Sequence, residues 1–224
     1  RYSYTGFDVD FVSRVEPDRI EGRLIHLFAP DPTPRLRDVQ NGSAPLPWTA
    51  VLYSKPQEEG ERAESIAVLK RHAVCFFSLF GHKLGLIGLH LKSNPSDVQA
   101  NAQRMAEAAI VRRIVQQEIV GRGYSPIILG DLNDYDPDVE MADPTRKTQT
   151  AVLQLLKDID SQRDGNELVN AAARIPRVAD RFSSHWDYNE NGAADGDDVF
   201  TLIDHILLSK ELATGLKRVF ICHA

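Results

Sequence analysis

Hydrophobic and polar positions alternate along some segments with the period of a β-strand and repeat along others with the period of an α-helix. Residues 7–13 alternate apolar and polar side chains, which predicts a half-buried strand. Two longer apolar runs, at 73–79 and 84–90, are separated by a short turn that contains Gly81, so they are expected to pair as an antiparallel hairpin. A short aliphatic run at 127–129 predicts one more strand.

The clearest helical pattern covers residues 96–120, where alanines and arginines favour a helix and Ser96 can cap its first turn. Gly121 and Gly123 follow this segment and are expected to end the helix. A second, shorter helix is predicted at about 148–159. One face of the long helix is expected to carry the apolar residues Val98, Met105, Ala109, Val115 and Ile119.

The remaining segments are predicted to be loops and a terminal pair of strands. Residues 26–48 contain five prolines and little periodicity, which predicts a surface loop, and residues 160–182 are also expected to be irregular. Strands are predicted at 200–208 and 217–222, with a turn around 210–215 between them. Strands and helices interleave and the hairpin makes the sheet mixed. The pattern therefore indicates an α/β (α+β) fold with helices layered around sheets rather than a parallel barrel.

Composition is compatible with one globular domain. The 224 residues, 42% of them hydrophobic, can bury one sizeable core and show no compositional division, so we expect a single domain over residues 1–224. No stretch approaches the roughly 18 apolar residues of a membrane span, and we expect a soluble protein, a monomer. The chain begins at Arg1 without a methionine, so it is expected to be part of a longer protein, with export left open as one alternative.

Charge and cysteine content narrow the partners only slightly. The net charge of -6 argues against wholesale attraction to nucleic acid. Cys75 and Cys222 are too few for a disulfide scaffold, and Cys75 lies in an apolar run that predicts a buried thiol. A local basic patch can still meet phosphates, with the candidates Lys70, Arg71, Lys92, Arg112 and Arg113.

Two segments place polar groups directly after apolar strands. The first is Gly88-Leu-His-Leu-Lys-Ser93, and the second is Pro126-Ile-Ile-Leu-Gly-Asp-Leu-Asn-Asp134. In the second segment the aliphatic run stops at Gly130, and three side chains that can bind a cation or a phosphate follow it: Asp131, Asn133 and Asp134. Such strand ends are where a rigid scaffold presents chemistry.

Together with Arg104, four segments give the chain a family resemblance. Residues 7–14, 89–93, 129–134 and 202–209 occur in an order and spacing that resemble the endonuclease/exonuclease/phosphatase superfamily, over most of the chain from Phe7 to about Val219. Deoxyribonuclease-I-like nucleases, abasic-site endonucleases, neutral sphingomyelinases and inositol-phosphate phosphatases share this fold. The resemblance implies a four-layer α/β/β/α sandwich of mixed sheets flanked by helices, and a divalent-metal-dependent hydrolase acting on phosphate esters.

The resemblance also implies roles for particular residues. Asp131 is expected to orient or deprotonate the attacking water, and Asn133 to donate its amide to the phosphoryl oxygens. His90 can donate to a phosphate or protonate a leaving oxygen near neutral pH. Asp8 is the expected partner that orients His90, with Asp10 as the competing candidate. The alternative for the Asp131 turn is ordinary turn chemistry, in which its side chains bond nearby backbone amides.

Further candidates lie around this set. Lys92, Ser93 and Arg71 are predicted phosphate donors, against the alternative that they are simply solvated. Asp204 lies in a strand so apolar that its charge is expected to need a partner. The resemblance implies that this partner is a second catalytic histidine from a Ser-Asp-His segment. His205 is a poor substitute, because it is expected to point to the opposite face of the strand.

Three motifs of the superfamily have no counterpart in the sequence. The Ser-Asp-His segment is not found before Ala224, and the opening strands that carry an Asn and a Gln-Glu pair are not found after Arg1. We therefore expect an internal portion of a longer enzyme, incomplete at both ends and inactive on its own.

Residues 187–198 have the spacing of a calcium-binding loop. Gly192 occupies loop position 6, and Asp198 stands at position 12, where a longer glutamate would normally reach the ion with both oxygens. The candidate ligands at positions 1, 3, 5, 9 and 12 are Asp187, Asn189, Asn191, Asp195 and Asp198. No flanking pair of helices is expected, and a solvated acidic turn is the alternative.

These observations lead to one main hypothesis and two alternatives. The main hypothesis is a phosphoesterase using Mg²⁺ or Mn²⁺, because hard oxygen ligands dominate and no Cys/His cluster suggests zinc. Within it, a nuclease that hydrolyses phosphodiesters of nucleic acid by in-line attack of an activated water comes first. A phosphatase or phospholipase-type esterase is the alternative on the same scaffold, since fold does not determine substrate. A non-catalytic calcium-binding interaction module is the alternative from another class.

Overall fold

A six-stranded mixed sheet forms the centre of the computed structural model, which describes residues 2–5, 9–28, 50–54, 64–68, 72–93, 98–140, 151–159 and 167–222. Strands β7 and β8 are parallel, and all other neighbours are antiparallel, which confirms the expected mixed α/β class. The strands follow the spatial order β3 (Ile25–Phe28), β6 (His72–Leu79), β7 (His82–His90), β8 (Ser125–Asp131), β12 (Asp204–Ser209) and β9 (Leu168–Asn170).

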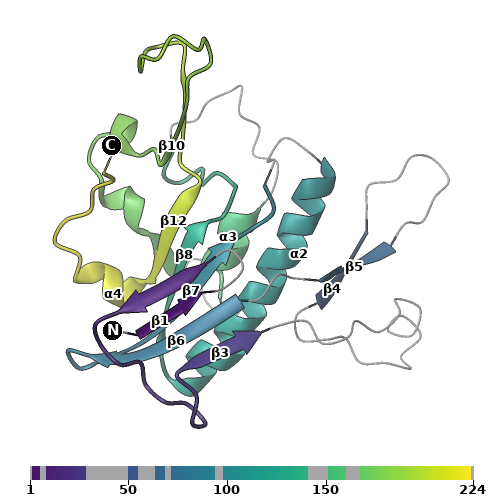
Figure 1. Cartoon of the computed structure of the whole chain (residues 1–224), viewed down its shortest axis with the longest axis vertical. Coiled ribbons are helices and arrows are strands. Elements are labelled where there is room, and N and C mark those ends of the chain that lie inside the picture. The colour runs from purple at the N-terminus through teal and green to yellow at the C-terminus, as the bar shows by residue number, and fades with distance from the viewer. Residues whose placement is uncertain are drawn as a thin grey trace.

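Six shorter strands form two-stranded ribbons around this sheet. They are β1 (Tyr2–Thr5) with β2 (Asp10–Ser13), β4 (Ala50–Ser54) with β5 (Glu64–Val68), and β10 (Ser184–Trp186) with β11 (Val199–Thr201). The β10–β11 hairpin extends beyond the end of the main sheet at the top of Figure 1. The β4–β5 ribbon lies at the opposite side of the long helix from the sheet strands.

The hairpin between β6 and β7 follows the prediction from the sequence. Its two-residue turn consists of Phe80 and Gly81, which have φ angles of 52° and 81°. Positive φ at both central residues is the type I′ geometry that matches the twist of the flanking strands, and Gly81 adopts it without steric cost.

The long helix is also where the pattern predicted it. It comprises α2 (Val98–Ile114), a π-helical turn (Val115–Ile119) and a 3₁₀ turn (Val120–Arg122), and Gly123 ends it with a φ of 78°. Ser96 lies outside the described residues. The buried face is broader than the predicted stripe, because Ile110, Val111 and Ile114 are fully buried whereas Met105 and Ala109 are only partly so.

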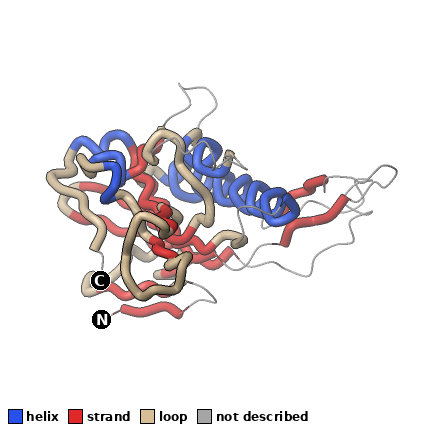
Figure 2. Tube along the Cα trace, turned by 90° about the horizontal axis from the view of Figure 1, so that it is seen from above, coloured by secondary structure: helices blue, strands red, loops and turns tan. Residues whose placement is uncertain are grey.

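The helices cover one face of the sheet, called here the rear face. Rear-face residues Ile87 and Ile128 are fully buried and belong to one apolar cluster with Ile114 of α2 and Leu156 of α3 (Val152–Lys157). A Cβ atom on Gly85 would lie 2.4 Å from Cγ2 of Ile119, which shows how closely the helical layer approaches. Figure 2 shows the helices gathered on one side of the strands.

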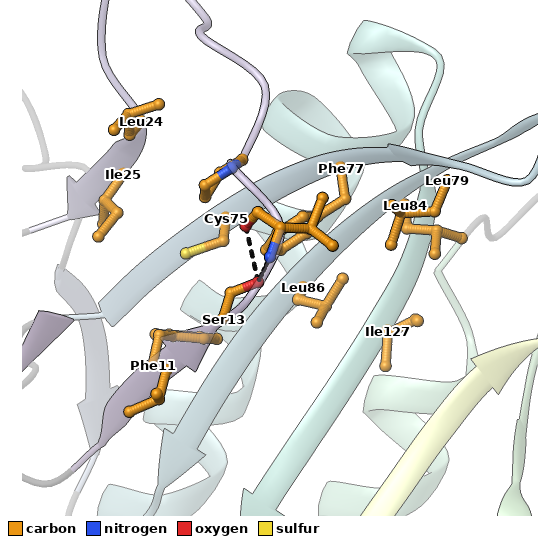
Figure 3. Close-up of a pocket in the computed structure, with 13 residues that line it drawn as sticks. Phe11, Ser13, Leu24, Ile25, Cys75, Phe77, Leu79, Leu84, Leu86 and Ile127 are labelled. Carbon is orange, nitrogen blue, oxygen red and sulfur yellow. Dashed lines mark hydrogen bonds between the residues drawn. The ribbon is translucent and has the colours of Figure 1, made fainter. Parts of the chain in front are cut away.

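The β1–β2 ribbon lies on the other face, called here the front face (Figure 2). A Cβ atom on Gly88 would lie 2.3 Å from Cγ1 of Val9, so the residue that precedes β2 packs directly over β7. Beside it a hollow of about 540 Å³ remains open, and Figure 3 shows its apolar lining, which includes Phe11, Phe77 and Leu86. Three layers of the expected four are therefore represented among the described residues.

The carboxyl-terminal part of the chain departs from the prediction. The expected strand at 200–208 is two strands, β11 and β12, separated by Leu202 and Ile203. Leu202 is buried in a second apolar cluster, so the chain turns from one ribbon into the main sheet there. The predicted strand at 217–222 is wrong, because Val219 and Ile221 pack against this cluster without pairing.

Three other local predictions need correction. A short helix, α4 (Lys210–Thr214), replaces the expected turn, and the Ser209 hydroxyl caps it by accepting the Leu212 N–H at 3.3 Å. Strand β3 occupies the start of the expected loop, whose residues 29–48 lie outside the described part, and β9 lies in the stretch expected to be irregular. No helix within the described ranges is long and apolar enough to cross a membrane.

Candidate active site

Three of the predicted site residues meet at one edge of the main sheet. In the parallel pairing of β7 with β8, His90 lies opposite Asp131, and in the antiparallel pairing of β8 with β12, Asp204 lies opposite the same Asp131. Leu89, Ile128 and Leu207 face the buried rear cluster. Because side chains alternate along a strand, His90, Asp131 and Asp204 point to the front face. Strand register thus brings together residues far apart in sequence.

The group is open to solvent on the front face. Nε2 of His90 lies 3.8 Å from Oδ2 of Asp131, and the two side chains are 38% and 28% exposed. Asp204 is exposed to solvent. The expectation that its charge needs a partner in an apolar strand is therefore wrong. The reason is that the front of β12 is uncovered here: Ile206, two residues on, is also 49% exposed.

Asp131 has the electrostatic character of a proton acceptor. Burial is the largest cause that raises the pKa of its carboxyl, and the negative charge of Asp204 raises it further. Hydrogen bonds from Asn133 lower the pKa, and so does the electrostatic effect of the nearby His90. The pKa of Asp131 lies above its usual range as a result, which makes the carboxylate a better base toward water.

The turn after β8 shows ordinary turn chemistry and also places Asp131 at the candidate site. Asn133 adopts a φ of 49°, and its backbone N–H donates to Oδ1 of Asp131 at 2.9 Å, which is ordinary turn chemistry. The buried Asn133 side chain also donates from Nδ2 to the Leu91 carbonyl at 3.2 Å. This bond ties the turn to the end of β7, so Asn133 holds the two strand ends together.

The predicted phosphate donors are only partly described. Lys92 and Ser93 are exposed immediately after His90 and Leu91, at the site edge. The Lys92 backbone is anchored to α2, because its N–H donates to Oε2 of Glu107 at 2.8 Å and its carbonyl accepts from Nη1 of Arg104 at 2.6 Å. Asp8 and Arg71 lie outside the described residues.

A buried ion pair lies behind the site, and it takes up Asp134, which the sequence offered as a side chain able to bind a cation or a phosphate. Nε of Arg104 lies 3.9 Å from Oδ2 of Asp134, and both side chains are fully buried. Burial is the main cause that raises the pKa of Asp134 to about 6. The signal was present, since polar Asn101, Arg104 and Glu107 recur at helical spacing on a face of α2 that is otherwise apolar.

The candidate calcium loop is closed by its own hydrogen bonds. The Asp187 carboxylate accepts the Gly192 N–H at 2.7 Å, and Oδ2 of Asp195 accepts from the Asn191 side chain at 2.7 Å. Oδ2 of Asp198 bonds Nε2 of His185 at 2.7 Å, and this bond is the main cause that lowers the Asp198 pKa. Asn189 also belongs to this network, through its side-chain contact with Asp195 at 3.4 Å.

The described residues do not complete a metal site. Asp131 and Asp204 offer carboxylate oxygens at one place, as hard cations prefer. Within the described ranges, however, no group of three or more His, Cys, Asp or Glu residues can hold a metal ion, either here or in the 187–198 loop.

No protein-family model and no curated protein matches the sequence. Among solved structures, the 3′-5′ exonuclease NExo from Neisseria meningitidis matches at 20% identity and a TM-score of 0.47, covering 75% of this chain and 62% of that one. D. rerio TDP2 complexed with single-strand DNA product matches at 15% identity and a TM-score of 0.38, covering 73% and 53%. The human Nocturnin catalytic domain with bound sulfate matches at 16% identity and a TM-score of 0.37, covering 72% and 60%.

These matches are partial likenesses of fold. The chain spans 50% to 53% of the length of three TDP2 structures and 39% of a fourth. The proteins matched have the endonuclease/exonuclease/phosphatase (deoxyribonuclease-I-like) fold, the resemblance expected from the sequence motifs.

Proposed function

We propose that this chain belongs to a phosphoesterase and that the edge formed by β7, β8 and β12 hydrolyses phosphodiester bonds. The supporting observation is the register that places His90, Asp131 and Asp204 side by side on one face, with the Asp131 pKa raised. A carboxylate base beside a hydrogen-bond donor can activate a water molecule and hold the phosphate that the water attacks.

In the proposed reaction, the Asp131 carboxylate accepts a proton from a water molecule as the water oxygen attacks phosphorus in line with the leaving oxygen. The new phosphorus–oxygen bond forms while the bond to the leaving oxygen breaks. The leaving oxygen, on the opposite side of phosphorus, takes its proton from solvent, and His90 donates a hydrogen bond to a non-bridging oxygen beside Asp131. Lys92 and Ser93, exposed next to the pair, are the proposed donors to the non-bridging oxygens, together with the Asn133 amide.

Nucleic acid is the first proposed substrate because the site lies on an open edge. The β10–β11 hairpin begins beside Asp204, whose backbone N–H donates to Oγ of Ser183 at 2.9 Å. This hairpin carries two exposed aromatic side chains, Trp186 at 65% and Tyr188 at 68%. Exposed rings beside a phosphate site can stack on bases. A phosphatase or a phospholipase-type esterase remains the alternative on the same residues.

The test uses the full-length protein that contains this chain. Hydrolysis of plasmid DNA, a lipid phosphodiester and inositol phosphates is measured with Mg²⁺, with Mn²⁺ and with a chelator. We expect DNA cleavage that the chelator removes, and an Asp131→Ala variant slowed roughly 10²- to 10⁴-fold without loss of folding. Asp180→Asn, which changes a partly exposed carboxylate outside the site, is the control. Activity unchanged in Asp131→Ala, or no hydrolysis of any of the three substrates, would reject the proposal.

The calcium-binding module is the second candidate function. Its support is that three of the five candidate ligands already lie together, because the side-chain amides of Asn189 and Asn191 both donate to Oδ2 of Asp195. Calorimetry with Ca²⁺ is expected to show binding that Asp187→Ala weakens. Asp197→Ala is the matched control, because position 11 of such a loop is not a ligand. No binding, or equal binding in both variants, contradicts the calcium site.

We further propose that the single domain over residues 1–224 has the four-layer arrangement that the superfamily resemblance implies. The support is the apolar lining of the front-face hollow, which includes Phe77, Leu84 and Leu86 and is partly open in the described residues. Apolar surface of this kind is stabilised when another layer covers it.

A further inference from the structure

Directly behind the proposed site lies a buried polar network that no role in the proposed reaction explains. On β12, Asp204 points to the front face while the next residue, His205, points to the rear and is only 2% exposed. Nε2 of His205 lies 2.9 Å from the backbone carbonyl oxygen of Asp134, and Nδ1 lies 2.9 Å from Nδ2 of Asn170. One imidazole therefore joins the turn after β8 to β9.

The partners of Asn170 determine which ring nitrogen carries the proton. Oδ1 of Asn170 accepts the Ala172 N–H at 3.1 Å, so the other end of this amide is the nitrogen. Its two hydrogens point to Oδ2 of Asp136 at 3.0 Å and to Nδ1 of His205. Nδ1 is consequently an acceptor, and the single ring proton lies on Nε2 and is donated to the Asp134 carbonyl.

The surroundings keep this imidazole neutral. Burial is the largest cause that lowers the pKa of His205, outweighing the opposing effects of the Asp134 carbonyl and of the nearby Asp136 and Asp204 charges. The neighbouring cation also disfavours protonation, because Nζ of Lys157 lies 2.8 Å from Oδ1 of Asp136. A second ring proton would meet the Asn170 amide hydrogen, so protonation would break the network.

The turn that His205 contacts is also held by other contacts from outside it. Asn133 adopts the left-handed region, with a φ of 49°, which asparagine tolerates better than most non-glycine residues. The turn is held at Leu132, whose N–H donates to the Ile203 carbonyl at 2.9 Å, and at Asn133 through the Leu91 carbonyl. Two contacts hold its far end at Asp134: the His205 bond to the Asp134 carbonyl oxygen, and the ion pair of the Asp134 carboxylate with Arg104.

We propose that His205 is a positioning residue for the site. By donating from Nε2 to the Asp134 carbonyl, it fixes the turn that carries Asn133 and so the direction of the Asp131 carboxylate. This inference rests on the proposed function for its effect on catalysis, but not for its effect on structure. A phenylalanine would fill similar space without this bond, which separates positioning from simple packing.

The first test is nitrogen-15 NMR of the histidine rings in the intact protein. For His205 we expect a protonated Nε2 and an unprotonated Nδ1. A proton on Nδ1, or on both nitrogens at neutral pH, overturns the proposal even if no variant folds.

The second test compares His205→Phe with His205→Gln, whose side-chain amide can restore a donor near the position of Nε2. His205→Phe is expected to accelerate hydrogen exchange at the Asn133 and Tyr135 amides and to lower kcat roughly 10- to 100-fold with little change in KM, and His205→Gln to recover part of both. His26→Phe is the matched control, since Nε2 of His26 also bonds a backbone carbonyl, that of Ile20 at 3.0 Å, far from the site.

The outcomes separate this inference from the proposed function. Normal amide exchange and normal kcat in His205→Phe overturn the positioning role while leaving the phosphoesterase intact. A protein that hydrolyses none of the substrates removes the proposed function, and amide exchange together with the ring tautomer then decides the positioning role alone.

Discussion

The two faces of the main sheet differ in how completely they are covered. Ile128 on the rear face is fully buried, whereas its neighbour Ile127 on the front face is partly exposed and lines the open hollow. The same contrast divides β12, where Leu207 is fully buried and Ile206 is 49% exposed. The rear face therefore supplies most of the packing of the sheet, while the front face leaves room for the proposed chemistry.

The largest expected effect tests this contrast at adjacent positions. Ile128→Ala removes a fully packed side chain and is expected to lower the free energy of unfolding by about 4 kcal/mol. Ile127→Ala is expected to cost about 1–2 kcal/mol, because its side chain is already partly in water. Urea denaturation of both variants measures the difference. Equal costs would show that another layer of the protein covers Ile127.

A slightly smaller effect depends on pH and on the buried Asp134. Its pKa is raised from 3.8 to about 6, so between these values the folded protein binds more protons than the unfolded chain. Stability from this group therefore falls as pH rises from about 4 to about 6, by about 3 kcal/mol in total. Denaturation at pH 4.5 and 7 compares the wild type with Asp134→Asn, which should lack this fall. Parallel profiles for the two proteins would contradict it.

Two glycines of β7 test how closely each face of the sheet is packed, and the expected effects are smaller. An added methyl group at Gly85 meets Ile119 on the rear face, and one at Gly88 meets Val9 on the front face. Each Gly→Ala change is expected to cost about 1–3 kcal/mol by overpacking, as measured by thermal denaturation. Adding Val9→Ala should restore much of the stability of Gly88→Ala but not that of Gly85→Ala. If it does not, Val9 does not pack over β7.

The smallest effect is chemical and leaves stability unchanged. Burial raises the pKa of the Cys75 thiol to about 11, whereas Cys222 is exposed. A thiol reagent at pH 8, followed by mass spectrometry, is expected to modify Cys222 promptly and Cys75 only very slowly. Because Cys75 lines the front-face hollow, its labelling rate also reports how often β2 lifts away. Rapid labelling of Cys75 would mean that the front cover opens readily.

Sequence pattern predicted the elements that local chemistry determines. The β6–β7 hairpin follows from apolar runs around Gly81, and the long helix from its alanines, arginines and closing glycines. His205 points to the opposite face from Asp204, as predicted, because side chains alternate along a strand. These features need no knowledge of distant residues.

Features set by tertiary contacts were not predictable from one sequence. The break at Leu202 depends on an apolar cluster that also contains Val139. The buried charge of Lys157 is explained only by two carboxylates far away in sequence, those of Asp136 and Asp138. Asp204 was expected to be buried because its strand is apolar, but hydrophobicity along a strand does not reveal which face another layer covers. The roles of His90, Asp131 and Asn133 stay predictions until activity is measured.

The break between β11 and β12 has a consequence for how this protein can change over evolution. Two hydrogen bonds hold the β10–β11 hairpin where it meets the main sheet. Oγ of Ser183 accepts the Ile203 N–H at 3.1 Å, and the Glu140 carboxylate accepts the Leu202 N–H at 3.0 Å. Residues can be inserted or deleted in the intervening loop without altering the register of β12. The hairpin is thus an exchangeable module, and homologues can acquire a new tip there while Asp204 and His205 keep their places.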